Sequence, residues 1–436
     1  MCTTTAGGRW LRSATRPLRR RQRPSIKASS RRWVKIPIPS TTVKLPRHIL
    51  PAIVFSQFTG ASPWFAGNAV LSDLQTLWGL PPDALAYMTS SVQLGFISGT
   101  LVFAVMAISD IFSPRKIFLI CTLLGAFCNA GVYLFAEGLW SLVVFRFLTG
   151  FFLAGIYPIG MKIAAGWYQR DLGKAMGFLL GALVLGTAFP HLLKALGHSL
   201  PWSSVILSVS AIAAFGGFVM YALVPDGPYL TKGAKFDPTA LKVIFQSKNF
   251  RSSAYGYFGH MWELYTFWAF VPVMLAIHIG SGTAVSIDIP LWAFLVIGAG
   301  VIGCVAGGLL TGKFGSARVA SAQLGISGIC CMLSPFVFSM PSPIFLLFLL
   351  IWGTTVVGDS PQFSTLNALY APKELVGSAL TIVNCIGFSI TIISIQLLTY
   401  ASHFIEIRWL FLLLTIGPAA GLFAMRPLIG AQAART

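Results

Sequence analysis

Long apolar segments recur along the whole chain and constrain its fold more than any other feature. A helix that crosses the hydrocarbon core of a membrane needs about 20 predominantly apolar residues. Only 10% of the 436 residues are charged, against roughly 25% in soluble proteins, so lipid must solvate most of the chain. In lipid a backbone has to pair its own polar groups, as a helix does. We therefore predict an all-α membrane protein with twelve transmembrane helices, which begin near residues 48, 85, 117, 139, 174, 202, 252, 288, 319, 342, 374 and 404.

The longest connection between these segments divides the chain into two groups of six. This linker contains Asp237 and Pro238, which suit the cap and the first position of a short surface helix. The predicted organisation is a six-helix bundle over residues 48–224, a cytoplasmic linker over 225–250, a second bundle over 251–426 and a tail over 427–436.

Residues 1–47 form a basic arm that belongs to neither bundle. Residues 1–48 hold 13 of the 31 Lys and Arg side chains and no Asp or Glu, a composition typical of a disordered or targeting segment. Three interpretations stay open: an organelle transit peptide, a cytoplasmic tail on anionic lipid, and sequence upstream of the true start codon.

The basic residues of the short loops predict the orientation, because loops rich in Lys and Arg face the cytoplasm. Both termini and the linker then lie on the cytoplasmic side of a plasma (inner) membrane, or of an organelle inner membrane if the arm is a transit peptide. The basic loops hold Arg115, Lys116, Arg170, Lys174, Lys232, Lys235, Lys242, Lys248, Lys313, Arg318 and Lys373.

The two halves of the chain repeat each other. Residues 109–116, "SDIFSPRK", follow the second predicted helix, and "TGKFGSAR" (311–318) follows the eighth. At an offset of 203 residues, Gly155 falls on Gly358 and Pro158 on Pro361. Two related six-helix halves predict a pseudo-symmetric transporter with its site between them, near the middle of the membrane.

The loop after the second helix resembles the signature of the major facilitator superfamily. That signature runs Gly-x-x-x-Asp-x-x-Gly-Arg-(Lys/Arg), and the chain keeps Asp110 with Arg115 and Lys116. The departures are Met106 and Ser113 in place of the glycines and Pro114 in place of the first arginine.

The resemblance covers roughly residues 48–426 and extends to other helices. Arg146 and Gly150 match the Arg-x-x-x-Gly of the fourth helix, whereas "GALVLGTAFPHLL" (181–193) lacks the Gly-Pro and Gly-Gly that family antiporters carry in the fifth. The resemblance implies alternating access, in which two bundles rock around a cavity lined mainly by the first, fourth, seventh and tenth helices. It also implies that Asp110, with Arg115 and Lys116, latches the cytoplasmic side. The residues alone are equally consistent with a plain topological anchor.

Glu263 and His260 stand in "YFGHMWELYTFWAF" (257–270), an apolar stretch of the seventh helix. Glu263 lies about 17 Å into the membrane, where an ionised side chain costs roughly 2.5–3.5 kcal/mol. His260 is three residues earlier and shares its face. Either the two satisfy each other, or Glu263 is protonated at rest. Glu263, His260 and Asp359 of the tenth helix are therefore proton-coupling candidates, with charge pairing for packing as the alternative.

Two cations, Arg146 and Lys162, lie in the fourth helix and would point in nearly opposite directions if that helix were straight. Arg146 either meets an acid such as Asp359 or Glu263, or binds an anionic solute. Lys162 lines the cavity or extends toward the interface. The substrate-cavity candidates are Arg146, Lys162, Gln57, Trp64, Asn68, Thr355 and Gln362.

These features predict a secondary active transporter of a small polar solute, possibly an anion, that works by alternating access and is coupled to protons. The alternatives are proton-driven efflux of an organic compound, a non-transporting membrane sensor, and a membrane enzyme that uses His260 and Glu263 as acid and base. No nucleophile, metal cluster or cofactor motif supports the enzyme. The expected partners are the solute, the proton and the lipid bilayer, with no nucleic acid, and the protein is expected to act as a monomer. Solute, direction and coupling ion stay open.

Overall fold

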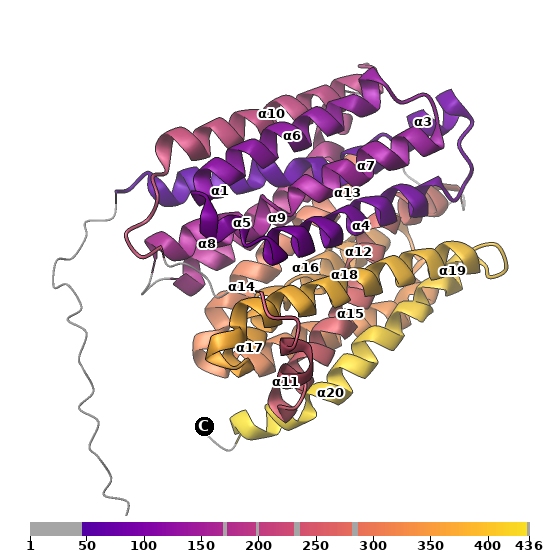
Figure 1. Cartoon of the computed structure of the whole chain (residues 1–436). Helices are drawn as coiled ribbons and strands as arrows, with labels where there is room; N and C mark the ends of the chain where they lie inside the picture. The colour runs from indigo at the N-terminus through magenta and orange to yellow at the C-terminus, as the bar shows by residue number, and fades with distance from the viewer. Residues whose placement is uncertain (1–45, 169–171, 198–199, 231–235, 281–286, 434–436) are drawn as a thin grey trace, which may run out of the picture. The chain divides into compact units, whose positions relative to one another are not determined.

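The computed structural model describes residues 46–168, 172–197, 200–230, 236–280 and 287–433. Within these ranges every regular element is a helix (Figure 1). Eleven of the described helical segments are long and apolar enough to cross a membrane. They are α4 (Ala84–Val105), α6 (Pro114–Leu134), α7 with α8 (Leu139–Trp167), α9 (Leu172–Leu196), α10 (Trp202–Leu223), α12 (Lys248–Gly280), α13 with α14 (Ile289–Phe314), α15 (Ser316–Val337), α16 with α17 (Ser342–Tyr370), η2 with α18 (Lys373–Ala401) and α19 to α20 (Ile407–Gly430).

The first crossing is interrupted. It consists of α1 (Ile49–Ala61), a 3₁₀ turn, η1 (Ser62–Phe65), and α2 (Ala66–Ala69), followed by α3 (Leu71–Trp78). Pro63 causes the interruption, since it has no N–H to give to the carbonyl of Thr59. That carbonyl instead accepts the hydroxyl of Ser62 at 2.7 Å. Together with the eleven longer segments, this interrupted crossing confirms the all-α fold predicted from the sequence. Each crossing begins within about four residues of its predicted start.

The fourth and tenth crossings break at equivalent positions. The fourth consists of α7 (Leu139–Leu153) and α8 (Tyr157–Trp167), and the tenth of α16 (Ser342–Val356) and α17 (Ser360–Tyr370). All four pairs of helix ends differ by 203 residues. Pro158 and Pro361 open the second piece in each case, a position that suits proline because its missing N–H would have no helical partner there. The internal repeat therefore extends to the places where the backbone is interrupted.

Side chains from both halves of the chain meet within the helical unit. α4 packs along α18, and α9 along α13. Gln396 Nε2 donates to Ser90 Oγ at 3.0 Å, and His403 Nε2 lies 3.0 Å from Asp83 Oδ1. These contacts hold the first half to the second at one end of the helices.

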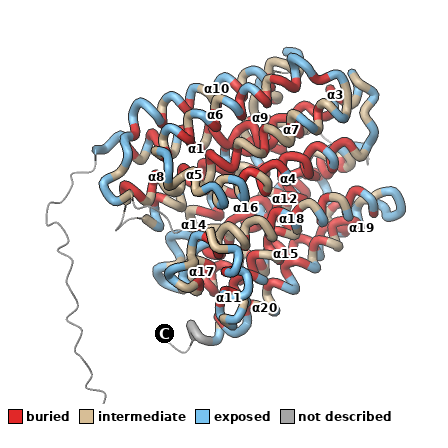
Figure 2. Tube along the Cα trace, in the orientation of Figure 1, coloured by how far each residue is buried: buried red, intermediate tan, exposed pale blue. Residues whose placement is uncertain are grey.

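The burial pattern is that of a protein solvated by lipid. Buried positions face neighbouring helices, while exposed positions occur along the outer sides of the crossings (Figure 2). Many of these exposed positions carry large apolar side chains, such as Leu94, Phe127 and Phe215. Extended exposed apolar surface of this kind fits a multi-pass membrane protein.

The connection between the two halves contains the short helix α11 (Ala240–Ile244). The helix begins two residues later than Pro238. Asp237 does not cap it, because Asp237 Oδ1 accepts the backbone N–H of Thr239 at 2.8 Å and its hydroxyl at 2.7 Å in a local turn.

Candidate functional site

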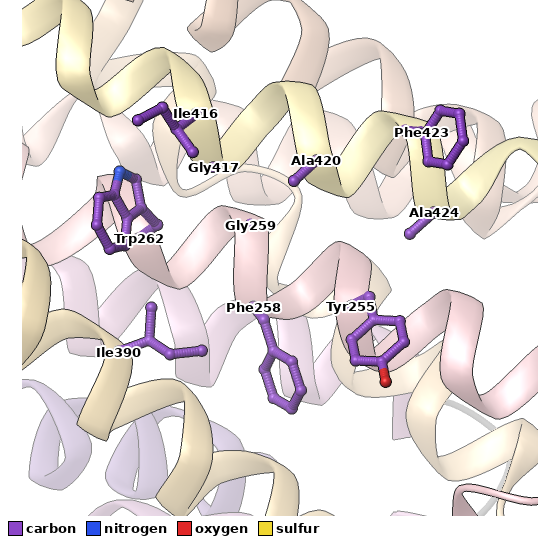
Figure 3. Close-up of a pocket in the computed structure, with 10 residues that line it drawn as sticks. All are labelled: Tyr255, Phe258, Gly259, Trp262, Ile390, Ile416, Gly417, Ala420, Phe423 and Ala424. Atoms are coloured by element: carbon purple, nitrogen blue, oxygen red, sulfur yellow. The ribbon is translucent and has the colours of Figure 1, made fainter.

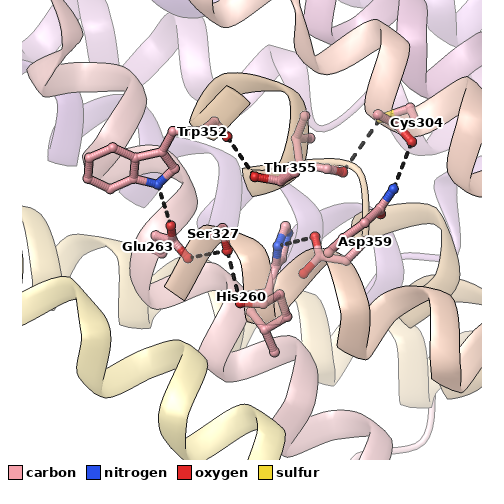
Figure 4. Close-up of polar contacts among 11 residues, drawn as sticks. His260, Glu263, Cys304, Ser327, Trp352, Thr355 and Asp359 are labelled. Atoms are coloured by element: carbon pink, nitrogen blue, oxygen red, sulfur yellow. Dashed lines mark hydrogen bonds and ion pairs between the residues drawn. The ribbon is translucent and has the colours of Figure 1, made fainter. Parts of the chain in front are cut away.

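Asp359 and His260 form a buried pair at the break in the tenth crossing. His260 Nδ1 on α12 lies 2.7 Å from Asp359 Oδ1, and both side chains are at most 1% exposed (Figure 4). The contact is at ion-pair distance but lacks the alignment of a hydrogen bond. The other polar atoms of the pair, His260 Nε2 and Asp359 Oδ2, have no hydrogen-bond partner among the described residues. They are therefore available to a proton, water or solute.

The break itself places Asp359. Pro361 gives no N–H to the carbonyl of Val357 four residues earlier, and that carbonyl accepts the backbone N–H of Ser360 at 3.1 Å and contacts the thiol of Cys304 at 3.5 Å. Asp359 thus stands just before the first residue of α17, in irregular backbone between two helices. The ring of His260 lies against Phe363 of α17, with centroids 5.8 Å apart.

Glu263 faces a different set of partners. Its Oε1 accepts the indole N–H of Trp352 at 2.6 Å and the thiol of Cys331 at 3.3 Å, and its Oε2 accepts the hydroxyl of Ser327 at 2.9 Å (Figure 4). Both oxygens are thus engaged by α15 and α16. The sequence left open a mutual pair between Glu263 and His260, and in the structure each side chain contacts partners of its own. Glu263 links α12 to α15 and α16. His260 links α12 to Asp359 at the start of α17.

Arg146 is fully buried and meets neither of these acids. Its Nη1 donates to Asn129 Oδ1 on α6 at 3.1 Å, and its Nη2 donates to the backbone carbonyl of Trp64. Asn129 is oriented for this role because its Nδ2 donates to Ser210 Oγ at 2.9 Å and to the carbonyl of Ile206 at 3.2 Å. Nε of Arg146 has no hydrogen-bond partner among the described residues. The guanidinium therefore sits against two neutral acceptors, and its positive charge is not cancelled by either.

Lys162, the other cation of the fourth crossing, pairs with the loop motif that follows the second crossing. Its Nζ lies 2.5 Å from Asp110 Oδ1 and 2.6 Å from the carbonyl of Ser109. Asp110 lies in α5 (Ile108–Ile111), the short helix that follows α4. The sequence left open a cavity position and an interfacial position for Lys162, and in the structure its ammonium group contacts this loop.

The two cations that follow Asp110 along the chain have other surroundings. The guanidinium of Arg115 lies 5.3 Å from the ring centroid of Tyr221 and contacts its carbonyl at 3.4 Å, while Lys116 is exposed. Of the three residues expected to latch this loop, Asp110 is therefore the one that the structure pairs with the fourth crossing.

The remaining cavity candidates divide into satisfied and unsatisfied groups. Asn68 Nδ2 donates to Thr89 Oγ1 at 2.9 Å, and Thr355 Oγ1 donates to the carbonyl of Ile351 at 3.0 Å within its own helix. The amide groups of Gln57 and Gln362 are buried without a hydrogen-bond partner among the described residues. Buried polar groups are normally paired, so these two amides are the better candidates for contact with a solute.

Trp64 belongs to an aromatic cluster that bridges the two halves. Its ring stacks on Tyr265 with centroids 5.7 Å apart and on Phe388 at 5.8 Å, and lies 4.9 Å from Phe96. Phe96 in turn lies 4.6 Å from Phe388. Trp64 and Phe96 belong to the first half, Tyr265 and Phe388 to the second. Trp64 therefore closes the interface between the halves while its carbonyl holds Arg146.

Several of these residues were not predicted from the sequence. Trp352, Ser327 and Cys331 lie in apolar helices with no local feature that separates them from packing residues. Asn129 did carry a signal, because a lone amide in an apolar crossing needs a partner.

The sequence model of the Major Facilitator Superfamily matches residues 53–395. The chain belongs to this family. A Bacillus subtilis (strain 168) protein named as a niacin/nicotinamide transporter, NiaP, is 24% identical over 169 residues, 36% of this chain and 39% of that protein. A Haemophilus influenzae protein named as a metabolite transport protein is 28% identical over 165 residues, 36% of this chain and 37% of that protein. The D-galactonate transporter of Escherichia coli O6:H1 is 31% identical over 101 residues, 23% of each chain.

The match to these curated relatives spans less than two fifths of their length. In fold, the chain is similar to the crystal structure of the human organic anion transporter MFSD10 (TETRAN). That likeness has a TM-score of 0.66 at 14% identity and covers 87% of this chain and 99% of the other. Family membership and the eleven described long crossings establish a multi-pass membrane protein of the facilitator fold.

Proposed function

We propose that this facilitator-family protein is a secondary active transporter that carries a small organic anion by alternating access and couples its movement to protons. The observation that carries the coupling is the buried pair of His260 and Asp359. It lies between the seventh and tenth crossings, one of which is interrupted at that point. Interrupted helices and midplane ionisable residues are the elements from which transporters build coupling sites.

The pair suits proton coupling because its charge changes with one proton. Imidazolium and carboxylate together are neutral, whereas neutral imidazole and carboxylate carry a net charge of −1. In a site that excludes water, a net charge is far more costly than a neutral pair. Proton binding therefore favours a closed arrangement of α12 and α17 over an open one. A solute that binds the same arrangement becomes linked to the proton, since both shift one equilibrium.

Glu263 is the second coupling candidate. Its two oxygens already accept three protein donors, from Trp352, Ser327 and Cys331. That arrangement supports a structural role, in which the carboxylate joins α12 to α15 and α16. The coupling role is accordingly assigned first to Asp359 with His260.

Arg146 supports an anionic solute. Its guanidinium is buried against neutral acceptors, so a carboxylate that approached it would gain a charge-assisted bond. Among the similar proteins, one is named for D-galactonate and one as an organic anion transporter. Gln57 and Gln362 would supply neutral hydrogen bonds that orient the solute.

The pair of Asp110 and Lys162 is assigned to the latch. Its attachment of α5 to α8 makes the end of the second crossing move with the second piece of the fourth. We also assign both termini and the linker to the cytoplasmic side of a plasma or organelle inner membrane, from the basic loops. The unit of transport is the monomer.

Transport in proteoliposomes tests the coupling. A panel of labelled monocarboxylates that includes D-galactonate and nicotinate is first screened by counterflow with the full chain. The solute that exchanges is then offered with an inward proton gradient. Asp359→Asn should abolish accumulation and keep equilibrium exchange, because only the gradient-driven step needs titration.

Glu263→Gln is the matched carboxylate-to-amide control and should still accumulate solute. Normal accumulation by Asp359→Asn would overturn the assignment to this pair. Loss of accumulation in Glu263→Gln with exchange intact would transfer the role to Glu263. A protein that exchanges no solute in the panel would favour the sensor.

A further inference from the structure

A groove runs along the outer side of α12 and α20 (Ile416–Ala433) and continues into a basic pocket at its end. We propose that this continuous site binds an anionic phospholipid, with the phosphate in the basic pocket and an acyl chain in the groove. The residues that line the site do not include the candidate transport residues, and the proposal does not depend on the solute.

The groove has the chemistry of an acyl-chain site. Its volume is about 430 Å³, and Phe258, Ile390 and Ile416 contribute to its apolar lining. Figure 3 shows Trp262 and Ile416 at one end and Tyr255 and Phe423 at the other. The indole N–H of Trp262 donates to the carbonyl of Leu413 at 3.0 Å, so it leaves no unmet polar group in the groove.

Two glycines form the floor. A side chain built on Gly259 would collide with the backbone carbonyl of Gly417, and one built on Gly417 with that of Gly259. The helices therefore touch through their backbones at this point. Because neither glycine has a side chain, the two helices approach closely enough for their backbones to form this floor.

The basic pocket adjoins the groove at its Tyr255 end. Its volume is about 420 Å³, and it shares Tyr255 and Phe423 with the groove. Three exposed cations line it, Lys248, Arg251 and Arg426, and no acidic residue does.

The existing contacts of the two arginines orient them without adding a negative charge. Nη1 of Arg251 donates to the carbonyl of Phe245 at 3.0 Å, and the guanidinium of Arg426 lies 4.9 Å from the ring centroid of Phe423. Each keeps further N–H groups on a planar fork that suits phosphate.

The arrangement favours a lipid over a soluble anion. Phe423 is 68% exposed and Ile416 57% exposed on a membrane-crossing helix, so the groove opens where acyl chains surround the protein. Basic pockets between crossing helices suit anionic lipid head groups. Three cations at about 1 kcal/mol each correspond to a preference on the order of 100-fold for an anionic over a zwitterionic lipid.

Lipid titration of the purified full chain tests the proposal. Dioleoylphosphatidylglycerol and dioleoylphosphatidylcholine are titrated separately in detergent, and bound lipid is counted by native mass spectrometry alongside the apparent melting temperature. Phosphatidylglycerol should bind and raise the melting temperature at a concentration on the order of 100-fold lower than phosphatidylcholine. Inorganic phosphate at equal concentration should have no effect, because it has no acyl chain.

Two kinds of variant distinguish binding of the lipid head group in the basic pocket from binding of the acyl chain in the groove. The triple variant Lys248→Gln, Arg251→Gln, Arg426→Gln should remove the preference, whereas Lys242→Gln, Lys313→Gln, Lys373→Gln, with the same charge change at exposed sites, should keep it. Ala420→Phe should fill the groove and weaken lipid binding while the cations stay in place. Equal binding of the two lipids by the unaltered protein, or an unchanged preference in the first triple variant, would overturn the proposal. Protection by inorganic phosphate equal to that by lipid would also overturn it, in favour of a soluble anion site.

Discussion

Lys162 Nζ lies 2.5 Å from Asp110 Oδ1, and this pair joins the short helix after the second crossing to the second piece of the fourth. The two side chains are 22% and 18% exposed, so solvent screens the pair only in part. The acid of a motif that the sequence linked to Arg115 and Lys116 thus contacts a lysine 52 residues away.

Breaking this pair from either side should have the same effect. Asp110→Asn and Lys162→Met each remove a contact worth on the order of 1 kcal/mol, and should shift the distances between spin labels on the two halves in the same direction. The double variant should shift them by less than the sum of the two single shifts, since the two side chains contact each other. Lys194→Met, which breaks the 2.7 Å pair with Asp73, is the control and should leave the distances unchanged. If Asp110→Asn leaves the distances unchanged, the loop is a topological anchor.

A new carboxylate beside Arg146 should compete with an anionic solute. Asn129→Asp places it 3.1 Å from the guanidinium without changing side-chain size. The variant loses the bond from Asn129 Nδ2 to the carbonyl of Ile206, so its apparent melting temperature is measured first. The folded variant should bind its carboxylate solute about 10-fold more weakly or worse, because the cation is already neutralised. Binding is measured by thermal shift against the solute found by counterflow.

Asn384→Asp adds the same charge beside Tyr257 in the other half and should change that affinity less. Unaltered affinity in Asn129→Asp would make Arg146 a structural cation that holds α6 to the first crossing.

Glu263 should contribute to stability through its hydrogen bonds. Glu263→Ala leaves the buried indole N–H of Trp352 unpaired, which costs about 1–3 kcal/mol, whereas Ser327 keeps the carbonyl of Leu324 as an acceptor. Trp352→Phe removes one donor and should cost about 1 kcal/mol. The apparent melting temperature should therefore be highest for the unaltered protein, lower for Trp352→Phe and lowest for Glu263→Ala. Equal stability of all three proteins would contradict the anchoring role.

The stability that is lost when His260 is changed should be regained when Asp359 is changed as well. His260→Gln leaves the buried carboxyl group of Asp359 without its histidine partner, and breaking a buried charged pair costs about 3–5 kcal/mol. Adding Asp359→Asn removes the uncompensated charge and should restore most of the melting temperature, although accumulation stays lost. A double variant less stable than His260→Gln would show that the two side chains do not form a pair.

The crossings were predictable because each depends on local sequence. Apolar runs set the helix ends. Pro158 and Pro361 stand at the two breaks, but proline alone does not locate a break, because Pro190, Pro272 and Pro335 lie inside continuous helices. The repeat of 203 residues was visible in the two prolines at the breaks and in Gly155 and Gly358.

The partners of the polar residues were not predictable in the same way. Glu263 accepts from residues 64 to 89 positions away, and only the packing of three crossings brings them together. The sequence left open an acid or an anionic solute as the partner of Arg146, and the partners that the protein itself supplies are an amide and a backbone carbonyl. Those groups occur throughout the sequence, so no pattern singles them out.

The aromatic cluster around Trp64 holds the two halves of the chain together. Trp64 meets Tyr265 and Phe388, and Phe96 meets Phe388, across the interface between the halves. At about 0.5–1.5 kcal/mol for each ring pair, three such contacts amount to roughly 1.5–4.5 kcal/mol. On the proposed alternating-access mechanism, these contacts favour the arrangement in which the two halves meet around Trp64. Opening it is a thermally activated step whose cost the arriving solute has to offset by binding the open form more tightly.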